Sequence, residues 1–245
     1  MQRLKHYRAF AFSAYGRKFK PPALRVVVDA YSRNNMMLAN LSITEFLEKT
    51  ASKDPLPGGG SSAALSAAIA SSLSEMVANL TVGKKGYASV EDEMKAISKQ
   101  AADFRDKLIR YIDKDSDAYQ RVMQAFKLPK NTEEEKNIRA QAVQEGLKQA
   151  TLIPLRVAED AFKIIELAGK VVENGNRNAV TDGAVAAMMA RTAVLSALYN
   201  VKINLNQIKD RSFVDDVTGR VKFYETEIEK KEQKIRSKVV QRFIP

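Results

Sequence analysis

The stretch DPLPGGGSSAALSAAIASSLSEMVANLT, residues 54–81, decides the fold class. It opens with a loop of two prolines and three glycines. A run made almost entirely of Gly, Ala and Ser follows up to position 74, and larger side chains recur along it at helical spacing: Leu65, Ile69, Leu73, Val77 and Leu80. This spacing predicts a long helix. Because a helix with such small side chains lets its neighbours approach closely, we expect it at the centre of a helical bundle.

The rest of the chain is also helical in pattern from residue 42 onward. Two Ser/Thr-x-x-Glu capping boxes, Ser42 with Glu45 and Thr132 with Glu135, predict helix starts. Further helices are expected over 90–126, 132–172, 178–198 and 213–240, and Pro154 should kink or split the second of these regions. The only candidate strand is 24–28. The sequence therefore predicts an all-α fold, a multi-helix bundle with central buried Ala/Ser-rich helices.

Composition excludes several kinds of site. The chain has no Cys and a single His, His6. A disulfide scaffold, a thiolate nucleophile, a Cys-ligated metal and a Ser-His-Asp triad are therefore excluded, and no metal site is expected. An enzyme of this composition must use carboxylates, Lys, Tyr, hydroxyls, amides and backbone groups.

Charge divides the chain unevenly. The net charge is +11, and residues 1–35 contain eight Lys and Arg against a single acid, Asp29. We interpret 1–35 as a basic N-terminal extension, either a disordered tail or a mis-assigned translation start, and 36–245 as the domain. A nucleic-acid-binding arm is the alternative interpretation of 1–35. No apolar run of 18 residues is free of charge, so no membrane span is predicted.

The glycine loop resembles a phosphate loop, but its sequence differs from one. Walker A needs a Lys after the last glycine, and here Gly60 is followed by Ser61. Two properties remain. The loop delivers backbone amides to a helix start, which favours a polar or anionic ligand, and it allows close approach of the backbone to another surface. From the residues alone, tight packing and ligand contact are both open.

Two acidic residues are candidates for chemistry. In DKDSD, Asp113 and Asp117 share a helical face while Asp115 points elsewhere. Such a cluster is ordinarily solvated surface, but an Asp turned into a small-residue interior is an acid–base candidate. Asp182 lies at the start of an Ala-rich helix, where a buried carboxylate needs a partner or a role.

Taken in order, DPLPGGGSSAAL, MVANLTVGKKGY, DKDSDAYQRVMQAFKLPK, GNRNAVTDGAVAA and NVKINL resemble the cyclodeaminase/cyclohydrolase family, over residues 41–210. This family includes the C-terminal domain of formiminotransferase-cyclodeaminase and stand-alone bacterial methenyltetrahydrofolate cyclohydrolases. The resemblance implies a homodimer or higher oligomer in the cytoplasm. It also implies one of two reactions, deamination of 5-formiminotetrahydrofolate to the 5,10-methenyl form or hydrolysis of the methenyl form to 10-formyltetrahydrofolate. Neither requires a metal or a cofactor beyond the folate substrate.

The resemblance also suggests roles for particular residues. Asp182 and Asp115, with Lys84 as a third candidate, would transfer the protons. The glycine loop would carry the pterin on bare backbone: Gly58, Gly59, Gly60 and Ser61. Amides would contact its polar edge: Asn176, Asn178 and Asn204. Cations would bind the anionic glutamate or polyglutamate tail: Lys84, Lys85, Lys202 and Arg177.

Two other classes of function remain open at this point. A non-catalytic helical scaffold would keep the fold without the reaction. Nucleic-acid binding through residues 1–35 would be lost on truncation and would fall steeply with salt. Between the two folate reactions the motifs do not discriminate. No formiminotransferase domain is recognised in the 245 residues, which favours the cyclohydrolase modestly if no partner that supplies formiminotetrahydrofolate is encoded nearby.

Overall fold

The structure, a computed structural model, describes residues 37–241. Contacts divide the chain into two units, residues 1–40 and 41–245. Of the first unit only 37–40 are described, and they hold the 3-10 helix η2 (Leu38–Asn40). The predictions for 1–35, including the strand at 24–28 and the domain boundary, lie outside the described residues.

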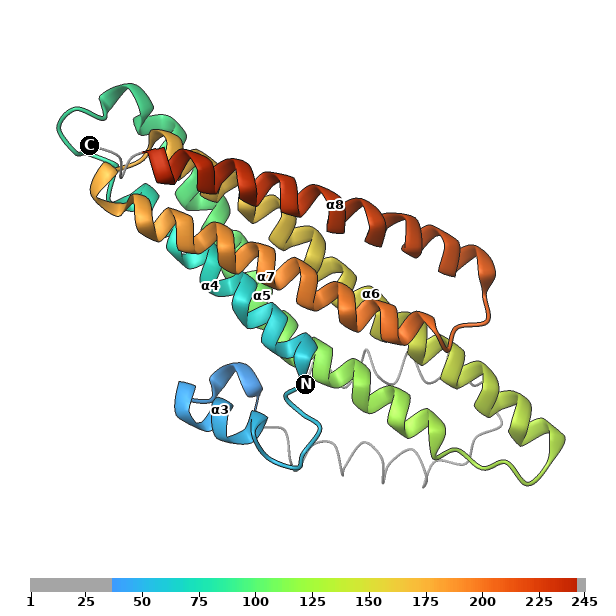
Figure 1. Ribbon diagram of the computed structural model, residues 1–245. Helices are drawn as coiled ribbons and strands as arrows, with labels where there is room; N and C mark the ends of the chain where they lie inside the picture. Colours follow the sequence, from blue (N-terminus) through green and yellow to red (C-terminus); the bar gives the residue numbers. More distant parts are fainter. Residues whose placement is uncertain (1–36, 242–245) are drawn as a thin grey trace. The chain divides into compact units, whose positions relative to one another are not determined.

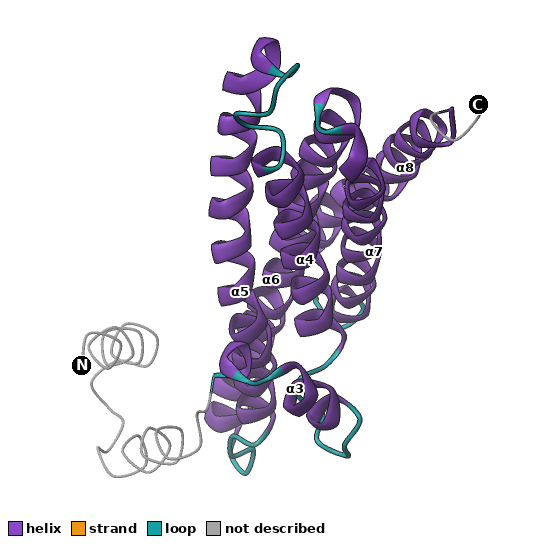
Figure 2. Ribbon diagram, turned by 90° about the vertical axis from the view of Figure 1, so that its left-hand side faces the viewer, coloured by secondary structure: helices purple, strands orange, loops and turns teal. Residues whose placement is uncertain are grey.

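Six α-helices and two short 3-10 helices make up the second unit, and no strand occurs among the described residues (Figures 1 and 2). The α-helices are α3 (Ile43–Thr50), α4 (Gly59–Asn79), α5 (Glu91–Phe126), α6 (Glu133–Asn174), α7 (Val180–Leu205) and α8 (Arg211–Gln241). The 3-10 helices are η3 (Ala88–Val90) and η4 (Arg177–Ala179). The all-α prediction is confirmed.

Both predicted capping boxes form. Ser42 caps α3 and Thr132 caps α6, and in each case the Glu three residues later returns a contact to the cap backbone. Two details differ from the prediction. Helix α7 continues to Leu205 rather than ending near 198, and α6 is not split at Pro154 but runs on through it.

The unbroken course of α6 has a local explanation. Proline has no amide hydrogen, so Pro154 cannot donate to the carbonyl of Ala150 one turn earlier. The side-chain amide of Asn204 on α7 donates to that carbonyl instead, at 3.0 Å. Asn204 thus replaces the missing helical hydrogen bond and joins α7 to α6.

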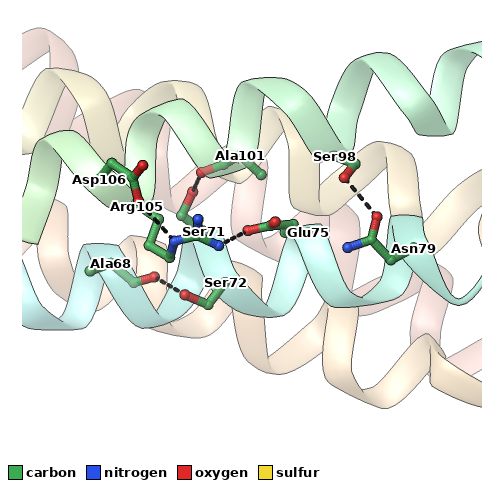
Figure 3. A network of polar contacts seen from close by, with 9 residues as sticks. All are labelled: Ala68, Ser71, Ser72, Glu75, Asn79, Ser98, Ala101, Arg105 and Asp106. Carbon is green, nitrogen blue, oxygen red and sulfur yellow. Dashed lines mark hydrogen bonds and ion pairs between the residues drawn. The ribbon is translucent and has the colours of Figure 1, made fainter.

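Helix α4 packs against α5, α6 and α7 through its small residues. The Ser66 hydroxyl donates to the Met189 carbonyl of α7 at 3.0 Å, and the Ser71 hydroxyl to the Ala101 carbonyl of α5 at 2.7 Å. Figure 3 shows the α5 side of this contact, where Arg105 also pairs with Glu75. Serine hydroxyls reach the neighbouring backbone directly because the small residues of α4 let the helices approach closely at these points.

Most buried side chains of α4 are Ala and Ser, as predicted for a central helix, and Val77 is fully buried with them. Three larger side chains, Ile69, Met76 and Leu80, are exposed instead. They lie on an outer face, between the sides that contact α5 and α7, and the exposed side of α7 continues this face. Seven large hydrophobic residues on this face are 38–68% exposed, and together we call them the outer stripe: Ile69, Met76, Leu80, Val185, Met188, Tyr199 and Ile203. The other positions along it include Ser62, Ser72, Thr181 and Thr192.

The region Arg177–Leu205 is long and apolar enough to cross a membrane by length and composition alone, and 44% of its most apolar window is buried inside the protein. Its buried side packs against α4, α6 and α8. Such a pattern also belongs to the core helix of a bundle. The prediction that the chain has no membrane partner therefore stays a prediction.

Candidate functional site

The start of α4 brings three helices together around one carboxylate. Gly58 caps α4 in an extended conformation, and Ser61 in the first turn is fully buried. The Ser61 hydroxyl oxygen lies 2.9 Å from the Ile112 carbonyl, 3.2 Å from Asp115 Oδ2 and 3.1 Å from the Ser116 hydroxyl, all on α5. The backbone amide of Ser61 also donates to Asp115.

Side chains from α5 and α7 lie so close to the backbone of this loop that they leave little room for a side chain at Gly59 or Gly60. A Cβ on Gly60 would lie 2.1 Å from Asp115 Oδ1, far inside contact distance. A Cβ on Gly59 would lie 3.3 Å from the side-chain nitrogen of Asn200 on α7. Gly60 therefore makes room for the carboxylate, and Gly59 for the amide. We call Gly58–Ser61, Asp115 and Asn200 the amino-end cluster.

Burial raises the pKa of Asp115 to about 6, and the hydrogen bonds from Ser61 oppose this shift without cancelling it. Near neutral pH both the carboxylate and the carboxylic acid are accessible. A carboxyl group poised in this way accepts a proton at one step and returns it at another. Beside it, the first amides of α4 point out of the helix end and favour a polar or anionic group.

The other end of α4 carries a second group of predicted residues. Asn176 is buried there: its backbone amide donates to the Thr81 hydroxyl at 2.8 Å, and its side-chain amide donates to the Leu80 carbonyl at 3.1 Å. Its side-chain oxygen accepts from the Asn178 amide. Asn176 thus holds the α6–α7 connection onto the end of α4, where its polar groups serve the fold.

The charged groups at this end are open. We call Lys84, Lys85, Asn176, Arg177, Asn178 and Asp182 the carboxy-end cluster. Within residues 37–241, the side chains of Lys84, Lys85, Arg177 and Asp182 form no ion pair or hydrogen bond, although many other charges in that range are paired. They are available to a ligand or to another chain.

The predicted site residues thus divide between two places. The 21 residues of α4 separate the two clusters by about 30 Å along the helix. Of the remaining predicted residues, Lys202 and Asn204 lie near the end of α7 that meets the amino-end cluster, where Lys202 pairs with Glu225 and Asn204 bonds to α6. One copy of the chain does not bring Asp115 and Asp182 together.

Two residues of the amino-end region were not predicted as site residues. Asn200 was one of several polar residues in NVKINL, and only its position against Gly59 distinguishes it. Ser116 contacts the Ser61 hydroxyl beside Asp115, and nothing in the stretch DKDSD distinguished it from the polar residues around it. Among the described residues, no group of three or more His, Cys, Asp or Glu is arranged to hold a metal ion.

Comparison with known proteins gives consistent matches. The family model for formiminotransferase-cyclodeaminase matches residues 42–223. Methenyltetrahydrofolate cyclohydrolase of Methylorubrum extorquens is 42% identical over 180 residues, which are 74% of this chain and 86% of that protein. Mouse formimidoyltransferase-cyclodeaminase is 33% identical over 184 residues, 75% of this chain but only 34% of the mouse protein.

A solved structure is similar as well. The crystal structure of formiminotetrahydrofolate cyclodeaminase from Thermotoga maritima superposes with a TM-score of 0.75 at 32% sequence identity. The match covers 84% of this chain and 98% of the other.

Proposed function

The chain belongs to the formiminotransferase-cyclodeaminase family, and from this premise we propose that it is a tetrahydrofolate one-carbon enzyme acting at the N5/N10 bridge. The observation that carries the proposal is Asp115, a part-buried carboxyl with a pKa of about 6 at the start of α4. The resemblance of the glycine loop and of DKDSD to the family's motifs supports placing the reaction there.

Of the two reactions, we favour hydrolysis of 5,10-methenyltetrahydrofolate to the 10-formyl form. The relative from Methylorubrum extorquens, named as the cyclohydrolase, is 42% identical and is covered over 86% of its length. The relatives named as formimidoyltransferase-cyclodeaminases are 32–33% identical. Cyclodeamination of 5-formiminotetrahydrofolate is the second candidate, since the structural relative from Thermotoga maritima is named for it.

The hydrolysis needs two proton transfers. As water attacks the methenyl carbon, the Asp115 carboxylate accepts one proton from it, which gives a neutral tetrahedral carbon bonded to N5, N10 and the new hydroxyl. The C–N5 bond then breaks while the Asp115 carboxylic acid returns its proton to N5. The hydroxyl loses its remaining proton to solvent as the formyl group forms on N10. One group with two accessible protonation states suffices.

The surrounding residues support binding of the folate. The first-turn amides of α4 and the Asn200 side chain offer polar contacts to the pterin beside Asp115. A cavity of about 900 Å³ is lined by Tyr199, next to Asn200 in the sequence, and by three cations, Lys202, Lys209 and Arg211. These cations suit an anionic glutamate or polyglutamate tail. The proposal needs no cofactor beyond the substrate, and it includes a homodimer and a cytoplasmic location.

Incubation with 5,10-methenyltetrahydrofolate tests the proposal. Loss of its near-ultraviolet absorbance should exceed the spontaneous rate, and Asp115→Asn should lower kcat by about 10²–10⁴-fold, because it removes the proton-transfer group. Release of ammonia from 5-formiminotetrahydrofolate measures the second candidate. Activity toward neither substrate would leave the scaffold interpretation.

Asp103→Asn is the matched control. Asp103 is on the same helix, and its side chain is 72% exposed and paired only with Lys99. A surface pair of this kind contributes little to stability, so the variant should keep full activity. Equal losses from both Asn variants would contradict a specific role for Asp115.

A further inference from the structure

Ser61 lies between α4 and α5 with one hydrogen to donate and two acceptors within reach. Its hydroxyl oxygen is 2.9 Å from the Ile112 carbonyl and 3.2 Å from Asp115 Oδ2, and the side chain is 0% exposed. A serine hydroxyl has a single hydrogen, so it cannot donate to both acceptors at once. The Ile112 carbonyl does not depend on this hydrogen, because it lies inside α5 and accepts from the backbone amide four residues later. The Ser61 hydroxyl can therefore turn from one acceptor to the other.

The charge on Asp115 decides which acceptor receives the hydrogen. Hydrogen bonds to an ionised carboxylate are shorter and roughly twice as strong as those between neutral groups. When Asp115 is ionised, Ser61 donates to Oδ2. When Asp115 carries the proton, the nearer Ile112 carbonyl receives the hydrogen instead. Ser61 has a partner in both states, and the exchange needs only a rotation of its hydroxyl group.

A second buried hydroxyl strengthens the ionised state. Ser116 is 5% exposed, and its hydroxyl oxygen lies 3.1 Å from that of Ser61. While Ser61 donates to Asp115, its oxygen can accept from Ser116, which gives a chain of two hydrogen bonds that ends on the carboxylate. Such a chain is cooperative, because each bond polarises the next.

Ser61 also contacts the carboxyl group through its backbone. Gly58, the residue before α4, has no side chain to cap the helix, and the Ser61 amide in the first turn donates to Asp115 instead. Asp115 thus takes the place of a capping side chain, and the lack of a side chain at Gly60 leaves room for it. This contact holds the carboxyl group whichever way the hydroxyl turns.

We propose that Ser61 is the positioning residue of the reaction: its hydroxyl hydrogen passes between Asp115 and the Ile112 carbonyl as Asp115 gains and loses the proton, while the carboxyl group stays in place. In this role Ser61 acts through Asp115 and does not touch the substrate.

Few charged side chains share this region with Asp115. Helix α4 has none before Glu75. On α5 and the neighbouring elements they are Asp113, Lys114 and Asp117, then Lys148 paired with Asp210, Lys202 paired with Glu225, and Lys49 paired with Asp54. Burial raises the pKa of Asp115, and the two Ser61 contacts lower it. Loss of the Ser61 hydroxyl should therefore raise this pKa further.

Titration of Asp115 in the full chain without substrate tests this role. Carbon-13 NMR of the carboxyl groups measures it, and Asp115→Asn identifies the resonance. In Ser61→Ala the pKa of Asp115 should lie about one to two pH units above the wild-type value of about 6, because a hydrogen bond to the ionised form is lost. Ser116→Ala should raise the pKa by less, since it removes only the reinforcing bond.

Ser71→Ala is the matched control. Ser71 is also fully buried on α4, and its hydroxyl donates to an α5 carbonyl, that of Ala101, at 2.7 Å, and not to a carboxyl group. This variant should leave the pKa of Asp115 unchanged. An unchanged pKa in Ser61→Ala, or an equal rise in Ser71→Ala, would overturn the proposal. If circular dichroism shows that Ser61→Ala does not fold, a rise or no rise in Ser116→Ala decides in the same way.

The pH profile tests the part of the inference that rests on the proposed function. In Ser61→Ala the rise of kcat/KM for methenyltetrahydrofolate should move to higher pH by the same one to two units or so, while kcat stays well above that of Asp115→Asn. A loss of kcat as large as in Asp115→Asn at every pH would overturn the positioning role and place Ser61 in the chemistry. Absence of wild-type activity on either folate would instead overturn the proposed function, and the titration would still decide whether Ser61 controls the carboxyl group.

Discussion

The two ends of α4 differ in whether their functional side chains are paired. At the amino-end cluster the polar groups contact one another: Ser61 touches Asp115 and Ser116, and the pKa of Asp115 is raised by burial. At the carboxy-end cluster Lys84, Lys85 and Asp182 are unpaired among the described residues. The first arrangement is fixed before a ligand arrives, as proton transfer requires, while the second can adapt to a ligand or a partner chain.

The strongest test of this difference is Gly60→Ala. The new methyl group would lie 2.1 Å from Asp115 Oδ1, so the carboxyl must move out of position. We expect kcat for methenyltetrahydrofolate hydrolysis to fall by about 10²–10⁴-fold, as on loss of the acid–base group itself. Gly219→Ala in α8 is the control, since its Cβ meets nothing within 4 Å and Ala is the better helix former. Unchanged kcat in Gly60→Ala would contradict the fixed geometry of the amino-end cluster.

The ionised Asp115 carboxylate should lower the free energy of unfolding at alkaline pH. Its pKa of about 6 in the folded chain exceeds the ordinary value of 3.8, so the folded state holds the proton more tightly than the unfolded state. The stability that protonation gives is complete below pH 4 and is lost as the pH rises through about 6, an effect of up to roughly 3 kcal/mol. Asp115→Asn should therefore be more stable than wild type at pH 8 and lose this advantage towards pH 4.

Urea unfolding at the two pH values measures this difference. A constant gap between the two chains would mean that Asp115 is not desolvated. In the wild type, kcat/KM should rise with pH through about 6 as the base form appears, and the remaining activity of Asp115→Asn should lack this rise.

Two asparagines, one near each end of the bundle, should affect stability rather than the reaction. Asn204 donates to the Ala150 carbonyl that Pro154 leaves free, and Asn176 bonds to the end of α4. Replacement of either by Ala should lower the free energy of unfolding by about 1–3 kcal/mol, since it leaves a buried group without its hydrogen-bond partner. Thermal unfolding measures this change. A large rise in KM without loss of stability would show instead that the amide contacts the pterin.

The smallest effect is expected from the exposed lysines. Lys84→Ala or Lys85→Ala should raise KM for a polyglutamylated folate by about three- to ten-fold at low salt, and less at high salt, because exposed charges are screened. Stability should not change. Lys99→Ala, which removes an exposed helix pair on α5, is the control. A salt-independent loss of kcat would place Lys84 in the chemistry rather than in binding.

Local patterns predicted the elements of this fold well, because they act over a few residues. The capping boxes at Ser42 and Thr132 lie where helices begin. The helix is not split at Pro154, and the group that compensates for it, Asn204, is 50 positions away in the sequence and gave no local signal. The spacing of the large α4 residues predicts a helical face, but it does not show that Val77 is buried while Ile69 and Leu80 are exposed.

The site was less predictable than the fold. The family motifs suggested the glycine loop, Asp115 and the polar residues around 176–182 as candidates, and their roles remain predictions. They carry no information on distance, so the separation of these motifs to opposite ends of α4 emerged only from the structure. Asn200 and Ser116 follow from contacts across helices, which no spacing within one segment reveals.

The close approach of Gly60 to Asp115 also constrains the order in which substitutions at these two positions can accumulate during evolution. While Asp115 keeps its present position, a side chain at position 60 would clash with its carboxyl group, but once position 115 has a smaller residue, alanine at position 60 fits the packing and favours the helix. From that state, restoring Asp115 alone creates a clash, so the two substitutions are coupled and reversal needs both. A descendant that lost the carboxyl and then acquired the Gly60→Ala substitution would keep the bundle and would regain the reaction only by a double change. Among relatives of this chain, the residue at position 60 therefore indicates whether a carboxylate at position 115 can lie where Asp115 lies here.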